Sequence, residues 1–269
     1  MAKIINHTIN SGIVQDVLTE LAERDMHDRY LGGGMSLQFF LPQNLHRITT
    51  DLDLESPIKK PFTEFKEDMT NILYNLSQRG YAVNFSKEGT TYDCLIERDN
   101  HMLALQMPRR GLKKYEELKP RLEKEFANSK IIPYGKGRLR VIGVNDIIAR
   151  KLLRIKVFHE EYGLEIPVNI EAERGVETAN ILKENLYKES FDRNPQELAK
   201  QIAYVRLLSD VSDIKAVLDH NPREIDSRSI SESLYLSSPR NFEGLEKLLD
   251  EIGISSKLDK KSPPEIFFS

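Results

Sequence analysis

The spacing of apolar residues changes once along this chain of 269 residues, close to residue 144. Before that point, short runs with the alternation of a β-strand are interspersed with helical runs, whereas only helical spacing follows it. This change favours an α+β fold in two parts. We predict a mixed, mostly antiparallel sheet with helices in residues 1–143 and a helical bundle in residues 144–269.

The individual elements are predicted from periodicity and from the positions of proline and glycine. In the first part, the pattern predicts helices over residues 10–25, 62–79 and 113–127, and strands over residues 50–55, 81–86, 91–98, 102–107, 130–134 and 138–144. In the second part, it predicts helices over residues 145–162, 171–187, 195–220, 222–234 and 239–253.

The composition argues against several classes of protein. Cys94 is the single cysteine, so the chain can form neither an intramolecular disulfide nor a cysteine-based zinc site. No apolar run is long enough to span a bilayer, and residues 1–10 lack the apolar core of a signal peptide. We therefore expect a cytoplasmic protein without a membrane partner. Neither a Walker-type P-loop nor a G-x-S-x-G motif is present.

Positive charge is concentrated in residues 104–156, which hold fifteen lysines and arginines against five acidic residues. The local net charge of +10 contrasts with a net charge of −3 for the whole chain. Such a segment can attract the phosphates of a nucleic acid. An exposed helix with charges of both signs explains the stretch "KKYEELKPRLEKEF" equally well, and the sequence leaves both interpretations open.

A glycine-rich turn and an Asp-x-Asp pair lie close together in residues 31–54, "LGGGMSLQFFLPQNLHRITTDLDL". A glycine turn before a helix presents backbone amides to an anion. Because side chains two residues apart in a strand share a face, Asp51 and Asp53 can hold one divalent cation. Each feature alone also fits a tight turn and a solvated strand end. Together they predict a site for a nucleotide and a metal ion.

This run resembles the first motif of the AbiEii/AbiGii toxin-type nucleotidyltransferases, which belong to the polymerase-β-like nucleotidyltransferase superfamily. The matching residues are Gly33 and Gly34 in the turn, Arg47 and Thr49 in an Arg-x-Thr stretch, and Asp51 and Asp53 in the metal pair. Two later stretches are also similar to the family. Residues 146–156 resemble its lysine-bearing helix, with Lys151 as the lysine, and residues 207–218 resemble its Arg-Asp-x-x-Asp-Leu helix, with Asp210 and Asp213 as the acids.

The resemblance implies a role for each matching residue. Asp51 and Asp53 would hold Mg²⁺ or Mn²⁺; Gly33, Gly34 and Ser36 would hold phosphates; Arg47 and Thr49 would contact the nucleotide, or Arg47 would pair with a carboxylate to hold its loop. Lys151 would neutralise the triphosphate, and Asp210 would orient Lys151 or activate the attacking hydroxyl. The residues also allow simpler interpretations, namely Lys151 on a solvated helix face and Asp210 as a surface acid paired with Lys215.

Three positions depart from the family pattern. Met35 stands where the family has threonine or serine, so Ser36 would have to supply the missing hydroxyl. The strand expected to carry a third metal carboxylate offers Gln106, with Asp93 and Glu97 on the neighbouring strand as substitutes. Ser209 replaces the arginine before Asp210.

The resemblance implies a magnesium-dependent enzyme that transfers a nucleoside monophosphate from an NTP to an acceptor hydroxyl. It also implies an RNA acceptor, such as the 3′ end of a tRNA, and a toxin restrained by a cognate antitoxin. The departures favour an alternative, a degenerate relative that binds a nucleotide or a protein without turnover. A small-molecule or protein acceptor is a third hypothesis. If Lys151 and Asp210 serve the same site as the Asp-x-Asp pair, that site requires both parts of the chain.

Overall fold

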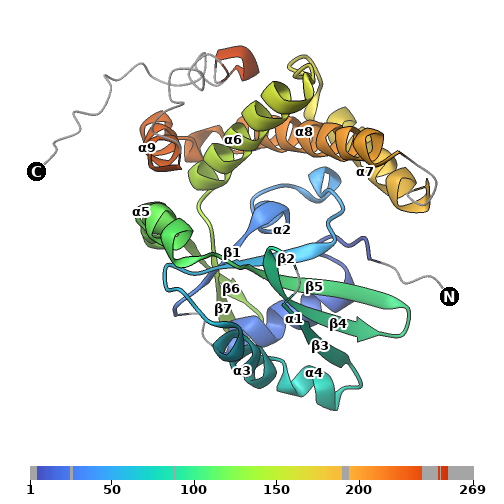
Figure 1. Ribbon diagram of the computed structural model, residues 1–269, viewed down its shortest axis with the longest axis vertical. Helices are drawn as coiled ribbons and strands as arrows, with labels where there is room; N and C mark the ends of the chain where they lie inside the picture. Colours follow the sequence, from blue (N-terminus) through green and yellow to red (C-terminus); the bar gives the residue numbers. More distant parts are fainter. Residues whose placement is uncertain are drawn as a thin grey trace, which may run out of the picture. The chain divides into compact units, whose positions relative to one another are not determined.

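The computed structural model describes residues 5–24, 27–87, 89–189, 194–237, 248 and 250–253. It contains two compact units, which are described separately: Met1–Phe39 with Ile48–Gly143, and Phe40–Arg47 with Val144–Ser269. The predicted α+β class is confirmed, since the strands lie in the first unit and the second is helical (Figure 1). Segment 40–47 groups with the helical unit although it precedes the Asp-x-Asp strand in sequence.

The first unit is built on a seven-stranded mixed sheet with the order β3-β4-β5-β2-β1-β7-β6. Its strands are β1 (Tyr30–Gly32), β2 (Asp51–Glu55), β3 (Ala82–Ser86), β4 (Thr91–Arg98), β5 (His101–Pro108), β6 (Lys130–Tyr134) and β7 (Gly137–Val141). Strand β2 runs parallel to β5, and β1 runs parallel to β7, whereas the other neighbours are antiparallel. The predicted predominance of antiparallel pairing is therefore confirmed.

The helices of this unit are α1 (Gly12–Glu23), α2 (Gly33–Leu37), α3 (Phe62–Ile72), α4 (Tyr74–Gln78) and α5 (Leu112–Asn128). The single helix predicted over residues 62–79 is wrong in one respect. Leu73 leaves the helical region, with φ −93° and ψ 12°, and separates α3 from α4. The break leaves Leu73 and Leu76 both buried, so the apolar pattern survives although the helix is interrupted.

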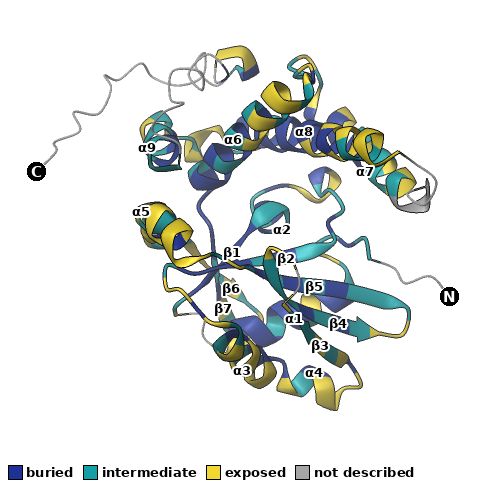
Figure 2. Ribbon diagram, viewed as in Figure 1, coloured by how far each residue is buried: buried dark blue, intermediate teal, exposed yellow. Residues whose placement is uncertain are grey.

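The alternation of β2 separates an apolar face of the sheet from a polar one. Leu52 lies opposite Leu105 of β5, which in turn lies opposite Cys94 of β4, and all three are buried. The next residue of β2, Asp53, points to the other face because successive side chains of a strand alternate. All three residues of β1 and three of the five residues of β2 are buried, and Figure 2 colours the unit by burial. The sequence pattern thus fixes the face on which the two aspartates lie.

The second unit contains η1 (Gln43–Leu45), α6 (Val144–Tyr162), α7 (Ala172–Glu189), α8 (Pro195–His220), η3 (Pro222–Glu224) and α9 (Ser227–Ser237). The long helix α8 packs against both α6 and α7. A Cβ atom on Gly175 of α7 would lie 2.0 Å from the Ser212 hydroxyl of α8, so glycine permits this close approach. Most of the helix predicted over residues 239–253 lies outside the described residues. No helix in the described ranges has the length and apolar character needed to cross a bilayer.

Candidate functional site

The glycine turn and the second aspartate of the Asp-x-Asp pair are in contact within the first unit. Gly32 lies opposite Asp53 in the antiparallel register of β1 and β2. The next residue, Gly33, has φ +66°, and a Cβ atom there would lie 1.7 Å from Asp53 Oδ2. Both the left-handed backbone and the missing side chain are therefore required at Gly33. The structure brings together two predicted site residues that are twenty positions apart in sequence.

The carboxylates of Asp51 and Asp53 lie on the polar face of β2, and both side chains are half-buried. Within the described part of the chain, the Asp51 carboxylate has no hydrogen-bond or ion-pair partner. Two carboxylate groups on one strand face can donate oxygen ligands to a divalent cation. No group of three or more histidine, cysteine or acidic side chains suited to a metal ion occurs among the described residues. The donor set here is thus a pair of aspartates.

The sheet register places Gln106 where a third carboxylate was sought. Gln106 lies opposite Asp53 of β2 on one side and opposite Asp93 of β4 on the other. Asp93 is two strands from Asp53, about 10 Å at the backbone, whereas oxygen ligands of Mg²⁺ or Ca²⁺ lie about 2.0–2.6 Å from the ion. Asp93 also accepts a hydrogen bond of 2.7 Å from the Thr91 hydroxyl. Glu97 lies farther along β4, opposite Met102. The structure therefore does not bring either substitute to Asp53.

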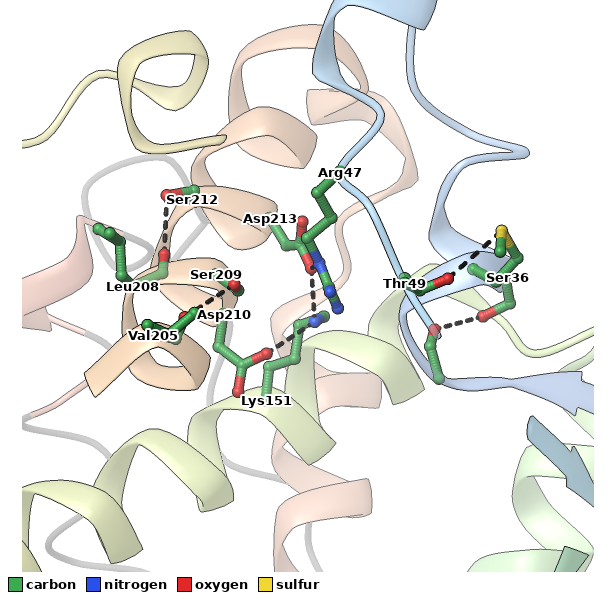
Figure 3. A network of polar contacts seen from close by, with 12 residues as sticks. Ser36, Arg47, Thr49, Lys151, Val205, Leu208, Ser209, Asp210, Ser212 and Asp213 are labelled. Atoms are coloured by element: carbon green, nitrogen blue, oxygen red, sulfur yellow. Dashed lines mark hydrogen bonds and ion pairs between the residues drawn. The ribbon is translucent and has the colours of Figure 1, made fainter. Parts of the chain in front are cut away.

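Helix α2 holds the hydroxyl that was expected to replace the one missing at Met35. Ser36 is 1% exposed, and its hydroxyl donates to the Gly33 carbonyl oxygen at 2.7 Å. Met35 is also 1% exposed, with Sδ 3.7 Å from the Thr49 hydroxyl (Figure 3). The Thr49 backbone pairs with His7 through two hydrogen bonds of 2.8 Å. In this conformation, Ser36 and Thr49 stabilise the loop, and a phosphate would have to be held by backbone amides.

A buried ion network occupies the helical unit. Lys151 Nζ of α6 donates to Asp210 Oδ1 at 2.8 Å and to Asp213 Oδ2 at 2.7 Å, both on α8 (Figure 3). Arg47 Nε donates to Asp213 Oδ2 at 2.8 Å, and Arg154 Nε donates to Asp210 Oδ2 at 2.5 Å. Three cations thus surround two carboxylates.

Charge compensation keeps this network ionised. Burial alone would raise the pKa of Asp210, but Arg154 and Lys151 hold that pKa well below its ordinary value. Burial would lower the pKa of Arg47, and the negative charges of Asp213 and Asp210 raise it instead. Four of the five charged groups are largely removed from water, whereas the Arg154 side chain is 45% exposed. Desolvating a charge is costly, so removing the partner of a buried member should destabilise the unit.

The contacts decide between the interpretations that the sequence left open in this unit. Lys151 is 2% exposed, so it does not lie on a solvated helix face. Lys215 donates to the Val168 carbonyl oxygen rather than to Asp210, which is fully buried. Of the two roles considered for Asp210, its contact fits the orientation of Lys151. Arg47 pairs with a carboxylate, as one of its two interpretations required.

Sequence reasoning missed one member of the network, Arg154. Its signal is nevertheless present, because Lys151 and Arg154 are three positions apart on α6, and Asp210 and Asp213 are three positions apart on α8. Residues at this spacing share a helix face, so two basic and two acidic residues form complementary faces. Ser209 does not replace the family's arginine in function, since its hydroxyl donates to the Val205 carbonyl oxygen at 2.8 Å within α8.

The predicted site residues therefore form two groups. Gly33, Gly34, Ser36, Thr49, Asp51 and Asp53 belong to the first unit, and Arg47, Lys151 and Asp210 belong to the second. In the first group, Gly33 contacts Asp53 and Ser36. In the second, Lys151 contacts Asp210 and is connected to Arg47 through Asp213. Helix α2 has five residues, so the expected contribution of a helix dipole to phosphate binding is small.

Comparisons with known proteins give distant structural similarity only. No protein-family model matches the sequence, and no curated protein matches it. One matching solved structure is described as an antigenic nucleotidyltransferase-like protein from Paracoccidioides brasiliensis, with a TM-score of 0.38 and 14% identity over 88% of this chain and 94% of that chain. A likeness at this level assigns neither a family nor an activity.

Proposed function

We propose that this chain is a divalent-metal-dependent nucleotidyltransferase that transfers a nucleoside monophosphate from an NTP to an acceptor hydroxyl. The observation that carries the proposal is the contact between Gly33 and the Asp53 carboxylate, beside Asp51 on the same strand face. The backbone amides of a turn beside two carboxylates can donate hydrogen bonds to phosphates. A divalent ion held by the same carboxylates can contact those phosphates as well. This contact and the sequence motif both support the proposal.

In the proposed reaction, the acceptor oxygen forms a bond to the α-phosphorus, the bond to the β-phosphate oxygen breaks, and pyrophosphate leaves. The acceptor hydroxyl gives up its proton to a base. Mg²⁺ or Mn²⁺ held by Asp51 and Asp53 would offset the negative charge of the triphosphate. Gly33 and Gly34 are proposed to contact the phosphates through their amides, and Ser36 and Thr49 to support that turn.

The roles of Lys151, Asp210 and Arg47 in this proposal rest on the motif resemblance. Lys151 is proposed as the cation that offsets charge on the leaving pyrophosphate, and Asp210 as the group that orients Lys151. The hydrogen bond between them supports the second role. Lys151 Nζ donates to two aspartates, so it is held in one position rather than free to rotate.

We propose RNA, such as the 3′ end of a tRNA, as the acceptor. The net charge of +10 in residues 104–156 supports this choice. A toxin role with a cognate antitoxin is the biological setting that the motif resemblance favours.

A degenerate binding module is the second candidate function, and a specific observation favours it. Gln106 lies between Asp53 and Asp93 in the cross-strand register. An acidic side chain at this position would give the proposed metal site a third carboxylate beside Asp51 and Asp53. A neutral amide contributes an oxygen ligand without offsetting the charge of the ion, so it weakens the hold on a divalent cation. Such a protein would bind a nucleotide and release it unchanged.

A transfer assay separates the two functions. The protein is incubated with each α-labelled NTP, Mg²⁺ and total RNA, in parallel with Asp51→Asn/Asp53→Asn and with the control Asp99→Asn. Asp99 has a side chain that is 82% exposed, and its φ of 55° suits asparagine. Label in RNA with wild type and Asp99→Asn, but not with the double variant, supports the enzyme. Nucleotide binding without transfer supports the degenerate module, and loss of both contradicts each proposal.

A further inference from the structure

A strongly basic cavity of about 530 Å³ opens in the first unit, on residues other than those of the proposed catalytic site. It is lined by Lys59, Lys60, Tyr92, Arg109, Arg110 and Gly111, among others. Four of these side chains are cationic, and the described lining contains no acidic residue. The cavity lies where the segment before α3, the start of β4 and the segment between β5 and α5 meet.

Two of the four cations have carboxylate partners behind the cavity wall. Lys60 Nζ lies 2.6 Å from Asp28, 2.8 Å from Glu64 and 2.9 Å from Asp68. Arg110 donates to both oxygens of Glu55, at 2.9 and 3.1 Å. These ion pairs hold Lys60 and Arg110 in place and also offset their positive charge, so these two side chains contribute fixed hydrogen-bond donors to the cavity.

The other two cations have no acidic partner in the described part of the chain. Arg109 donates to the Lys87 carbonyl oxygen at 3.2 Å, and no described carboxylate offsets its charge. Lys59 is exposed and makes no hydrogen bond or ion pair with a described residue. Positive groups that line one cavity repel one another, and an anion that enters the cavity relieves this repulsion.

Two helices also begin at the cavity wall. Pro61 precedes α3, which has eleven residues, and Gly111 precedes α5, which has seventeen. Neither helix start receives a side-chain cap, so the amides of their first turns remain available as donors. A Cβ atom on Gly111 would meet nothing within 4 Å, so the space beside this residue at the start of α5 is open. Helix starts favour anions through these amides and the helix dipole.

We propose that this cavity is a second phosphate-binding site. A phosphate group combines a high negative charge with several acceptor oxygens, which matches the donors of four basic side chains, two of them without an acidic partner among the described residues, and two open helix starts. Tyr92 adds an aromatic ring to the lining, on which a base next to the phosphate can stack. The site shares no residue with the Asp51 and Asp53 pair, so it does not depend on whether the chain transfers nucleotides.

The test removes the two cations without acidic partners, in Lys59→Ala/Arg109→Ala. A matched control, Lys136→Ala/Arg138→Ala, removes one lysine and one arginine from exposed positions of the same unit outside the cavity. The probes are inorganic pyrophosphate, followed by calorimetry, and a short 5′-phosphorylated single-stranded RNA, followed by fluorescence anisotropy. Both are measured with a metal chelator present, so that the Asp51 and Asp53 pair does not contribute through a divalent ion.

The cavity variant is expected to bind at least one probe about tenfold or more weakly, because hydrogen bonds from charged donors contribute this much. For RNA, the slope of log K against log salt becomes shallower by roughly 1.4 if two phosphate contacts are lost. Weakened binding of pyrophosphate alone identifies a free anion as the ligand, whereas weakened binding of RNA alone identifies its backbone. Equal effects in both variants, no change in either, or no binding of either probe to wild type would overturn the proposal.

Discussion

The backbone of Gly33 lies against the carboxylate of Asp53, so closely that a methyl group on Gly33 would lie 1.7 Å from Oδ2 and 2.7 Å from Cγ. The contact joins the turn that begins α2 to the middle of β2. Any side chain at position 33 must either move the turn or rotate the carboxylate away. The position of Asp53, and with it the geometry of the proposed metal pair, therefore depends on a glycine.

Gly33→Ala is expected to weaken Mg²⁺-dependent nucleotide binding at least about tenfold, because the displaced Asp53 carboxylate no longer shares an ion with Asp51. The left-handed backbone at φ +66° adds a loss of about 1–2 kcal/mol in the free energy of unfolding. Calorimetry with a nucleotide and Mg²⁺, together with urea unfolding, measures both effects.

Gly80→Ala is the matched control for this substitution. Gly80 also has a left-handed backbone, with φ +85°, but a Cβ atom there would meet nothing within 4 Å. Its cost in stability should be similar, about 1–2 kcal/mol, with nucleotide binding unchanged. If both variants lose binding equally, the effect comes from general destabilisation, and the contact with Asp53 is not what matters.

Gln106 lies opposite Asp53 on one neighbouring strand and opposite Asp93 on the other, and this position predicts that a carboxylate there would raise the affinity for a divalent cation. Gln106→Asp places a third carboxylate on the strand next to Asp53, on the same sheet face. We expect Mg²⁺ or Mn²⁺ affinity to rise by about tenfold, since affinity for hard cations increases with the charge of the ligand set. Asn84→Asp on β3, opposite Leu95, is a control that adds the same charge elsewhere in the sheet. Unchanged metal affinity in Gln106→Asp would show that Asp51 and Asp53 do not form a metal site at this position.

The buried network of the helical unit predicts a large loss of stability on removal of its central cation. Lys151→Met leaves Asp210 and Asp213 short of one partner each, and the free energy of unfolding should fall by about 3–5 kcal/mol. Arg154→Ala is expected to cost about 1 kcal/mol, because its side chain is 45% exposed and water replaces part of the lost interaction. Urea unfolding compares the two variants, and equal losses would contradict the central position of Lys151.

Local patterns predicted the sheet well because each strand carries its own alternation. Strand β4 spans Thr91–Arg98 and β6 spans Lys130–Tyr134, as predicted from the sequence. The break at Leu73 was missed because the apolar residues on either side keep helical spacing through it. Helix boundaries of this kind depend on packing, which periodicity does not report.

From local patterns alone, the candidate site was predictable only where its residues are close in sequence. Residues 33 and 53 lie on neighbouring elements, so their contact follows from one glycine turn and one strand. The partners of Arg47 and Lys151 lie on α8, more than fifty residues away. The motif resemblance implied that Asp210 orients Lys151, whereas the sequence did not identify Asp213 as the carboxylate that pairs with Arg47. The assignment of segment 40–47 to the helical unit had no local signal, because it depends on contacts between distant parts of the chain.

Cys94 provides a probe for the unfolding of the sheet. It lies in β4, is fully buried, and burial raises the pKa of its thiol to about 12. A thiol-specific reagent needs the exposed thiolate, so the folded protein should react far more slowly than the protein in urea. Because the chain has a single cysteine, the reagent reports on this position alone. Rapid reaction without denaturant would show that β4 opens readily or is not packed as described.

Acid should destabilise the first unit through Asp28. Burial would raise the pKa of this carboxyl, but Arg29 and Lys60 lower it from 3.8 to about 2. A carboxyl with a depressed pKa stabilises the folded state fully above its unfolded value, and this contribution is lost as the pH falls from about 4 to about 2. In Asp28→Asn, stability at pH 7 should be lower and its fall between pH 4 and pH 2 smaller than in wild type. Denaturant unfolding at several pH values measures this, with Asp99→Asn, at a side chain that is 82% exposed, as the control. Parallel stability curves for Asp28→Asn and wild type would contradict the assignment, because the ion pairs of Asp28 with Arg29 and Lys60 could then not be the source of the acid sensitivity.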